Sequence, residues 1–397
     1  MKSSIRVRLN RIWSFILIVQ VIWLCCACSA CAPADTGETA ETSVLTEETE
    51  AKTASVYSEG FNRADWLRDM MYRLGMTVAG ELSWDDYEAI FRTAYEKGLI
   101  DDPAPCPDIP LTREYTALTV TRALGYETRT AAAADLSADD SAMMTVVYYG
   151  YFQPDDSGRV YPQAEVTDEE YTALMIQLQR WRILHGKRLL SFGDSIMYGQ
   201  GNNGEGVSDM LGQKYGMTVS DYAVSGATFG VYQENSHIPD QVESAAWYGE
   251  QPDLILINGA TNDMRTLARG KITDGYDPDL FDTAKFAGGM EYAFWQLRLY
   301  WPNVPVIYIR AHDMDCCDDA TERLYGEYAL KIAAKWEVSC VDIYQDTDFD
   351  TEDPELRDSY TQYIPKKKLG DSIHPNAAGY ARYYLPLVGE KAAELIN

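Results

Sequence analysis

Five short apolar segments alternate with amphipathic helical patterns over the second half of this chain, and this alternation constrains its fold more than any other feature. The apolar segments are 187–194, 217–224, 254–257, 304–309 and 338–343. The helical patterns are 206–215, 286–301, 320–336 and 376–396. The third segment, 254–257, is apolar at every position, which is typical of a strand buried on both faces. The pattern therefore predicts an α/β fold in which helices cover both sides of a five-stranded parallel sheet.

Polar residues and glycine stand where several of these segments end. Ser195, Gly226, Asn262 and His312 each follow a predicted strand. Open parallel sheets bind ligands at the carboxyl ends of their strands. Four such positions at one edge of the sheet predict a single functional site there.

The residue types at this edge indicate nucleophilic catalysis. Ser195 follows Gly193 and Asp194, and far downstream Asp371 precedes His374 by three residues. A serine hydroxyl becomes a good nucleophile when an imidazole accepts its proton and a carboxylate orients that imidazole. We therefore expect Ser195 to be the nucleophile, His374 the general base and Asp371 its orienting partner, with no metal and no cofactor.

Attack on an acyl carbonyl also requires donors for the developing oxyanion. The backbone amides of Ser195 and Gly226 and the side-chain amide of Asn262 are the candidates, and Gly226 allows close approach because it has no Cβ. Asp194 and Asp263 are expected to support these residues, and for Asp263 a role in a local turn is favoured over a chemical one.

These segments resemble the four sequence blocks of the GDSL or SGNH hydrolases. The blocks are Gly193-Asp194-Ser195, Ser225-Gly226-Ala227, Thr261-Asn262-Asp263 and Asp371-x-x-His374-Pro375, in the order expected for that family. The resemblance covers residues 187–397. It implies a flavodoxin-like three-layer α/β/α sandwich and metal-free ester hydrolysis. It also implies that Ser195, Gly226, Asn262 and His374 are the residues after which the family is named.

Each residue also has a purely structural interpretation. Ser195 could occupy a turn or cap a helix, and Asp371 could cap the last helix. The presence of all four blocks favours catalysis. His312 is a candidate for lining the pocket. The acidic segment 312–319, which includes Cys316 and Cys317, matches no closed zinc pattern, so we expect it to cap the next helix.

The N-terminus predicts export. Four basic residues precede an apolar run from Ile12 to Leu24, which is followed by cysteines among small residues. This pattern is typical of a secretory signal, and Ser29-Ala30-Cys31 resembles a bacterial lipoprotein cleavage site with Cys31 as the lipidated residue. An uncleaved membrane helix is the alternative. Either way, residues 1–31 predict a protein anchored to the membrane at the bacterial surface, outside the cytoplasm.

Residues 32–60 are rich in Thr and Glu and nearly free of apolar side chains, which predicts a disordered linker. The whole chain carries a formal net charge of −27. Such a charge disfavours nucleic acid and other polyanions as partners.

Residues 61–182 form a smaller, mostly helical region with a faint repeat of roughly fifty residues. Thr112-Arg113-Glu114 recurs as Thr167-Asp168-Glu169, and Asn62-Arg63-Ala64 is a weaker copy. The unit resembles S-layer homology repeats, and that family binds cell-wall polymers. This region has two interpretations. It retains the protein on the cell wall, or it is a helical spacer or lid packed against the hydrolase.

The favoured function is therefore a surface-anchored serine ester hydrolase that removes short acyl groups, such as O-acetyl, from carbohydrate or cell-wall glycan. A lysophospholipase or short-chain lipid esterase is one alternative. A catalytically inert wall-binding tether is the other, and the four intact catalytic blocks disfavour it.

Overall fold

The computed structural model describes residues 61–232 and 236–397. The predicted signal or anchor at 1–31, its lipidation site Cys31 and the predicted linker at 32–60 lie outside the described residues and stay predictions. Gly60–Asn397 forms one compact unit. None of the helices in the described ranges is both long and apolar enough to cross a membrane.

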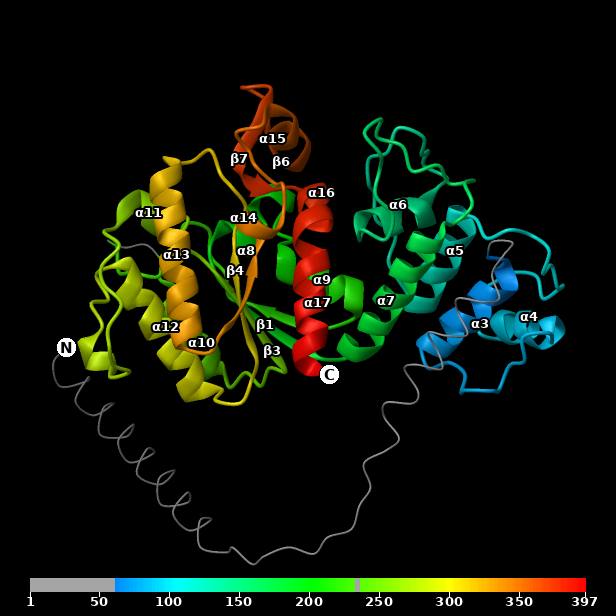
Figure 1. Ribbon diagram of the computed structural model, residues 1–397, viewed down its shortest axis with the longest axis horizontal. Helices are drawn as coiled ribbons and strands as arrows, with labels where there is room; N and C mark the ends of the chain where they lie inside the picture. The colour runs from blue at the N-terminus through cyan, green and yellow to red at the C-terminus, as the bar shows by residue number, and fades with distance from the viewer. Residues whose placement is uncertain (1–60, 233–235) are drawn as a thin grey trace, which may run out of the picture. The chain divides into compact units, whose positions relative to one another are not determined.

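The centre of the fold is a sheet of five parallel strands in the order β2-β1-β3-β4-β5 (Figure 1). The strands are β1 (Arg188–Phe192), β2 (Thr218–Asp221), β3 (Leu254–Asn258), β4 (Val306–Arg310) and β5 (Ser339–Asp342). This is the flavodoxin-like strand order. The predicted α/β class and five-stranded parallel sheet are confirmed.

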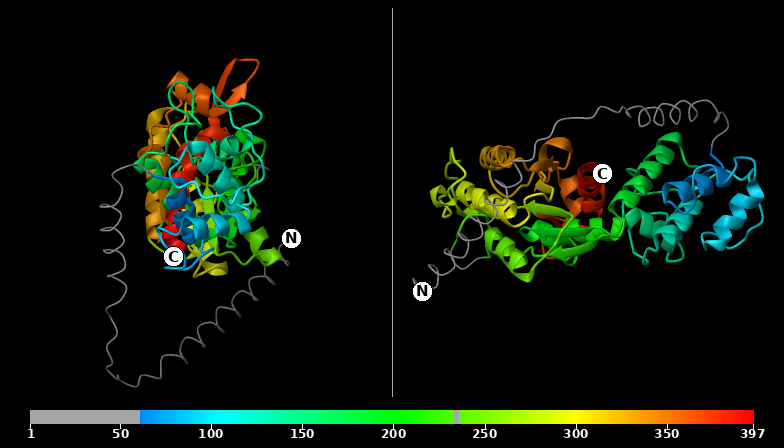
Figure 2. Two further views of the ribbon diagram at one scale, coloured as in Figure 1. Left: turned by 90° about the vertical axis from the view of Figure 1, so that its right-hand side faces the viewer. Right: turned by 90° about the horizontal axis from the view of Figure 1, so that it is seen from below.

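Helices cover both faces of the sheet (Figures 1 and 2). On one face lie α10 (Ile238–Tyr248), α12 (Phe286–Tyr300) and α13 (Asp319–Lys335), and on the other α9 (Val207–Tyr215) and α17 (Leu385–Ile396). Along β3, Leu254 and Leu256 join one hydrophobic core while Ile255 and Ile257 join the other. The strand is apolar from Leu254 to Ile257 because each of its faces is covered.

Shorter elements connect these layers. They are α8 (Ser195–Tyr198), η1 (Gln200–Asn202), α11 (Asp263–Thr266), η2 (Pro278–Leu280), α14 (Ile343–Asp346), α15 (Pro354–Tyr360), α16 (Ala377–Gly379), the π-helical turn η3 (Tyr380–Tyr384) and an antiparallel hairpin of β6 (Thr361–Ile364) and β7 (Leu369–Pro375).

The C-terminal tail differs from the prediction of one continuous helix over 376–396. It is divided into α16, η3 and α17. Pro386 stands at the start of α17 and has no amide hydrogen for the preceding turn, so the hydrogen-bonding pattern widens there. The cap of this tail is Asn376, whose side chain accepts from the Gly379 amide. Asp371 lies earlier, in β7.

The first 120 or so described residues are helical, as predicted. They contain α3 (Arg63–Arg73), α4 (Tyr87–Glu96), α5 (Arg113–Leu124), α6 (Ser141–Tyr148) and α7 (Asp168–Leu184). The three segments of the faint repeat are equivalent in structure, because Asn62, Thr112 and Thr167 cap α3, α5 and α7. Short β-bridges join these capping segments side by side. Residues 61–184 are called the helical region below.

The helical region shares a hydrophobic core with one face of the sheet. This core extends from Ala64 in α3 to Ala393 in α17. Helix α7 packs on α17, where Arg180 donates a hydrogen bond to Glu390 at 2.7 Å. The proposed boundary between two separate domains near residue 182 stays a prediction.

Candidate active site

The turn after β1 places Ser195 at the carboxyl edge of the sheet. Gly193 is required there because a Cβ at this position would lie 2.0 Å from the side-chain oxygen of Asn258. The next residue, Asp194, is fully buried and caps α8 by accepting a hydrogen bond from the Ile196 amide at 3.0 Å. Ser195 is the first residue of that short helix. Its hydroxyl therefore stands on a tightly fixed turn.

Ser195, His374 and Asp371 form one continuous chain of hydrogen bonds. The Oγ atom of Ser195 lies 2.9 Å from Nε2 of His374. On the other side of the ring, Nδ1 of His374 lies 2.5 Å from Oδ2 of Asp371. The structure thus brings Ser195 into contact with His374, although the two residues are 179 positions apart in the sequence. With Nδ1 protonated toward Asp371, Nε2 is free to accept the serine proton.

The backbone of β7 fixes Asp371 for this role. Its second carboxylate oxygen accepts hydrogen bonds from the amides of Ile373 and His374. Between Asp371 and Ile373, Ser372 adopts a left-handed conformation with a φ of 67°, and its carbonyl accepts from the Thr351 hydroxyl. Burial raises the pKa of the Asp371 carboxyl, but the hydrogen bonds from His374 outweigh this and hold it below its usual range. Asp371 is therefore ionised at neutral pH.

The three candidate oxyanion donors, Ser195, Gly226 and Asn262, lie on separate segments. The amide of Ser195 begins α8 and so has no intrahelical acceptor. Gly226 has a φ of 82°, and a Cβ placed on it would meet open space. The side-chain nitrogen of Asn262 donates one hydrogen to the Ala227 carbonyl at 2.9 Å, which leaves its second hydrogen for another acceptor. That bond also ties Asn262 to the segment that carries Gly226.

Asp263 has a structural role, but it stabilises a contact between distant segments and not a local turn. It is fully buried, and its two carboxylate oxygens accept from the amides of Phe229 and Gly230 at 3.0 and 2.9 Å. Burial raises its pKa to about 7, although these donors act in the opposite direction. Asp263 thus joins the loop after β3 to the loop after β2, which are the segments of Asn262 and Gly226.

His312 lies behind the triad and not on an exposed wall. It has no exposed surface, stacks on Phe349 and lies 2.8 Å from the Tyr384 hydroxyl through Nδ1. Burial lowers the pKa of His312 to about 3, so its imidazole is uncharged at neutral pH. His312 is thus a buried residue packed against Phe349 and Tyr384. The acidic segment after it caps α13 through Asp318, as predicted.

Two residues that position the nucleophile were not among the predicted site residues. The side-chain amide of Gln241 exchanges two hydrogen bonds of 2.9 Å with the backbone of Gly193. The side chain of Asn258 accepts from the Asp194 amide and donates to the Asp194 carboxylate, both at 3.3 Å. Each was visible as a polar residue in an apolar setting, Asn258 at the end of β3 and Gln241 on the buried side of α10.

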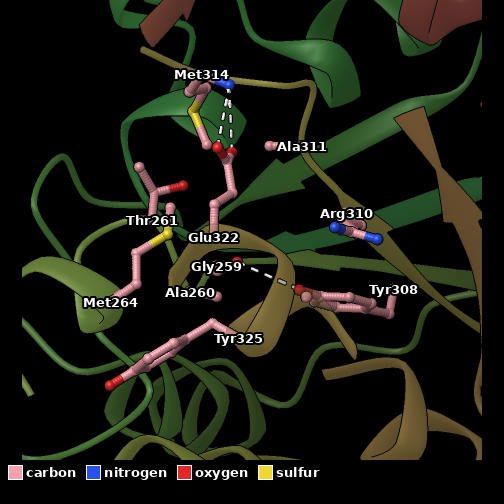
Figure 3. Close-up of a pocket in the computed structure, with 11 residues that line it drawn as sticks. Gly259, Ala260, Thr261, Met264, Tyr308, Arg310, Ala311, Met314, Glu322 and Tyr325 are labelled. Carbon is pink, nitrogen blue, oxygen red and sulfur yellow. Dashed lines mark hydrogen bonds between the residues drawn. The ribbon is translucent and has the colours of Figure 1, made fainter. Parts of the chain in front are cut away.

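A small cavity adjoins the same edge of the sheet (Figure 3). Its volume of about 20 Å³ is enough for roughly one water molecule. Thr261, which precedes Asn262, lies on its wall together with Tyr308 and Glu322. Glu322 accepts from the Met314 amide, and burial, followed by the charge of Asp313, raises its pKa to about 8.

The four cysteines of the described residues, Cys106, Cys316, Cys317 and Cys340, are free. Over 61–232 and 236–397, no group of three or more His, Cys, Asp or Glu residues is placed to hold a metal ion.

Comparisons with known proteins identify the domain that carries this site. Residues 191–382 match the GDSL-like Lipase/Acylhydrolase family. No curated protein matches the chain.

Solved structures with a similar fold have low sequence identity to this chain. A protein from Lactobacillus plantarum is 21% identical over 53% of this chain and 96% of its own, with a TM-score of 0.43. A carbohydrate acetylesterase from Sinorhizobium meliloti is 14% identical over 53% and 99%, with a TM-score of 0.37. The aryl esterase of M. smegmatis is 17% identical over 53% and 100%, also with a TM-score of 0.37.

Proposed function

We propose that this protein removes short acyl groups from carbohydrate or cell-wall glycan. Residues 191–382 form a GDSL-like lipase/acylhydrolase domain, and the protein is therefore a carboxylic ester hydrolase. O-acetyl groups are the expected substrates. The observation that carries the proposal is the unbroken hydrogen-bonded chain from the Ser195 hydroxyl through His374 to Asp371.

The proposed reaction proceeds through an acyl-enzyme. Nε2 of His374 accepts the proton of Ser195 as Oγ attacks the acyl carbonyl, and Asp371 stabilises the imidazolium that forms. The amides of Ser195 and Gly226 and the side chain of Asn262 stabilise the oxyanion. His374 then donates its proton to the sugar oxygen as the bond between this oxygen and the acyl carbon breaks. A water molecule that the same imidazole deprotonates attacks the acyl-enzyme, which releases the acid and restores the Ser195 hydroxyl.

The charge of the chain supports a neutral carrier for the acyl group. The net charge of −27 disfavours polyanionic substrates.

The test is hydrolysis of nitrophenyl esters from acetate to dodecanoate, together with acetate release from an acetylated glycan. We expect highest activity on acetate and loss of activity by at least 10³-fold in both Ser195→Ala and His374→Ala. His185→Ala, which removes an exposed imidazole at the end of α7, is the matched control and should retain activity. A folded wild-type protein that hydrolyses none of these esters would refute the proposal, and a preference for dodecanoate would favour a lipid esterase.

The proposed location is the outer face of the bacterial membrane. The support is the sequence of residues 1–31, with a basic start, an apolar run and Cys31 after small residues. Cys31→Ser should move the protein from the membrane fraction to the soluble fraction of the cells, whereas Cys106→Ser should not. Membrane retention of Cys31→Ser would instead indicate an uncleaved helix.

The helical region is also a proposed contact for cell-wall polymer. Its support is the resemblance of the three capped segments at Asn62, Thr112 and Thr167 to S-layer homology repeats. Co-sedimentation of the full chain with purified cell walls tests this. No retention above that of an unrelated acidic protein would exclude it.

A further inference from the structure

A glycine-rich segment packs between the helix that carries Ser195 and the backbone of His374. Residues 199–206, here called the 199–206 loop, join α8 to α9 and contain glycine at positions 199, 201, 204 and 206. A Cβ on Gly206 would lie 1.7 Å from the Met197 carbonyl of α8. A Cβ on Gly201 would lie 2.3 Å from the Pro375 carbonyl and 2.6 Å from the His374 carbonyl. The loop therefore packs directly against both the helix of Ser195 and the backbone of His374.

The outer side of this loop is held by two residues of the helical region. Nη1 of Arg129 donates to both carboxylate oxygens of Glu205, at 2.9 and 3.2 Å, and the Tyr148 hydroxyl donates to Glu205 at 2.6 Å. The side-chain nitrogen of Asn202 donates to the Glu205 carbonyl at 2.9 Å and lies 3.4 Å from the Tyr148 hydroxyl. Asn202 and Glu205 thus share Tyr148 as a partner, and Glu205 also binds Arg129.

The electrostatics agree with a fixed contact. Burial raises the pKa of the Glu205 carboxyl, but hydrogen bonds from Tyr148 and Arg129 more than offset this and hold it below its usual range. Glu205 is therefore charged at neutral pH, and its bonds are charge-assisted, which makes them stronger than neutral ones.

We propose that Arg129 and Tyr148 are positioning residues for the esterase, which act through Glu205 and the 199–206 loop on the placement of His374 relative to Ser195. This inference rests on the proposed function. Neither residue touches substrate. The helical region would then be a working part of the catalytic unit and not only a spacer.

The composition of the loop explains why outside support is needed. Glycine loses more conformational freedom on folding than any other residue, so a segment with four glycines in eight positions is ordered only when other contacts hold it. Catalysis by a serine–histidine pair depends on distance, and a misplacement of about 1 Å can cost about 10²-fold in rate. Loosening the loop should therefore lower kcat, while substrate binding elsewhere is preserved.

The experiment compares Arg129→Met, Tyr148→Phe and their double variant with wild type, using nitrophenyl acetate. We expect kcat to fall about tenfold in each single variant with KM within about twofold. The double variant should fall less than the product of the two effects, because both residues act through Glu205. Arg129→Lys keeps the charge and should recover part of the loss.

Arg180→Met is the matched control. It removes another arginine–glutamate contact between the helical region and α17, without touching the 199–206 loop. Its kcat should stay within about twofold of wild type. Equal kcat values in Arg129→Met, Tyr148→Phe and Arg180→Met, with an active wild type, would overturn the inference and leave the proposed function intact.

Hydrogen exchange provides a reading that does not depend on turnover. Peptides that cover 199–206 and 371–376 should exchange faster in Arg129→Met and Tyr148→Phe than in wild type or Arg180→Met. If the wild type hydrolyses no ester, the proposed function fails, and hydrogen exchange alone tests whether Arg129 and Tyr148 position His374. Faster exchange at 371–376 in Arg129→Met and Tyr148→Phe would support this role, and unchanged exchange would overturn it.

Discussion

Replacement of Lys214 by methionine should stabilise this protein in a pH-dependent way. Lys214 lies on α9 and is only 1% exposed. Its ammonium group lies over the rings of Tyr151 and Tyr215, at 4.7 and 5.5 Å from their centroids. Burial, with a smaller contribution from the charge of Arg180, lowers its pKa from 10.5 to about 7. Folding therefore disfavours the charged form of this side chain.

The magnitude follows from that difference in pKa. At about 1.4 kcal/mol per unit, the shift corresponds to a penalty of at most about 5 kcal/mol. Cation–π contacts with Tyr151 and Tyr215 offset about 2 kcal/mol of it, which leaves about 3 kcal/mol. Because the unfolded chain binds more protons between pH 7 and 10.5, the penalty is full below pH 7 and disappears as the pH rises toward 10.5. Lys214→Met should thus gain about 3 kcal/mol at pH 6 and progressively less above pH 8.

Urea unfolding at pH 6, 7, 8 and 9 measures this gain. The quantity of interest is the difference in free energy of unfolding between Lys214→Met and wild type, since other titrating groups cancel in it. Lys331→Met, which removes a lysine with 61% side-chain exposure, is the control and should change stability little at any pH. A gain that does not depend on pH, or a loss at pH 6, would refute the reasoning.

Three further predictions concern the site and its support. Asp371→Asn should lower kcat by about 10⁴-fold on nitrophenyl acetate, because an amide favours the wrong tautomer of His374; a loss below tenfold would contradict this role. Asn262→Ala should lower kcat by about 10²–10³-fold with little change in KM, and an effect on KM alone would argue against an oxyanion donor. Glu205→Gln should lower Tm by about 2 °C at pH 7. Because folding lowers the pKa of Glu205, the charged side chain stabilises the folded protein above the usual glutamate pKa. This stabilisation is lost as the pH falls through the lowered pKa. The Tm values of wild type and Glu205→Gln should therefore converge in acid.

The sheet was predictable because its three central strands, β1, β3 and β4, are buried on both faces. The continuous apolar run in β3 has no other simple explanation in a chain with helical patterns on each side. The site followed from the sheet, since parallel strands bring their carboxyl ends to one edge. Ser195, Gly226 and Asn262 could therefore be grouped without any knowledge of distances.

What escaped prediction depends on contacts between distant segments. The bonds from Arg129 and Tyr148 to Glu205 join positions 57 or more residues apart, and no local periodicity marks them. The hairpin of β6 and β7 is short and polar, so it resembled a loop, although it carries His374. The division of the C-terminal helix was signalled only by Pro386, a residue that is often tolerated at the start of a helix.

The core shared by Ala64 and Ala393 has a consequence for the order in which this protein can mature. During synthesis Ser195 emerges long before His374, and the α17 segment that completes the core against α7 emerges later still. A nascent chain that ends between Ser195 and His374 therefore has a nucleophile without its base, and a chain that ends before α17 has an open apolar face. Esterase activity can begin only when the final helix has docked, so a prematurely terminated chain would be both inactive and prone to aggregation.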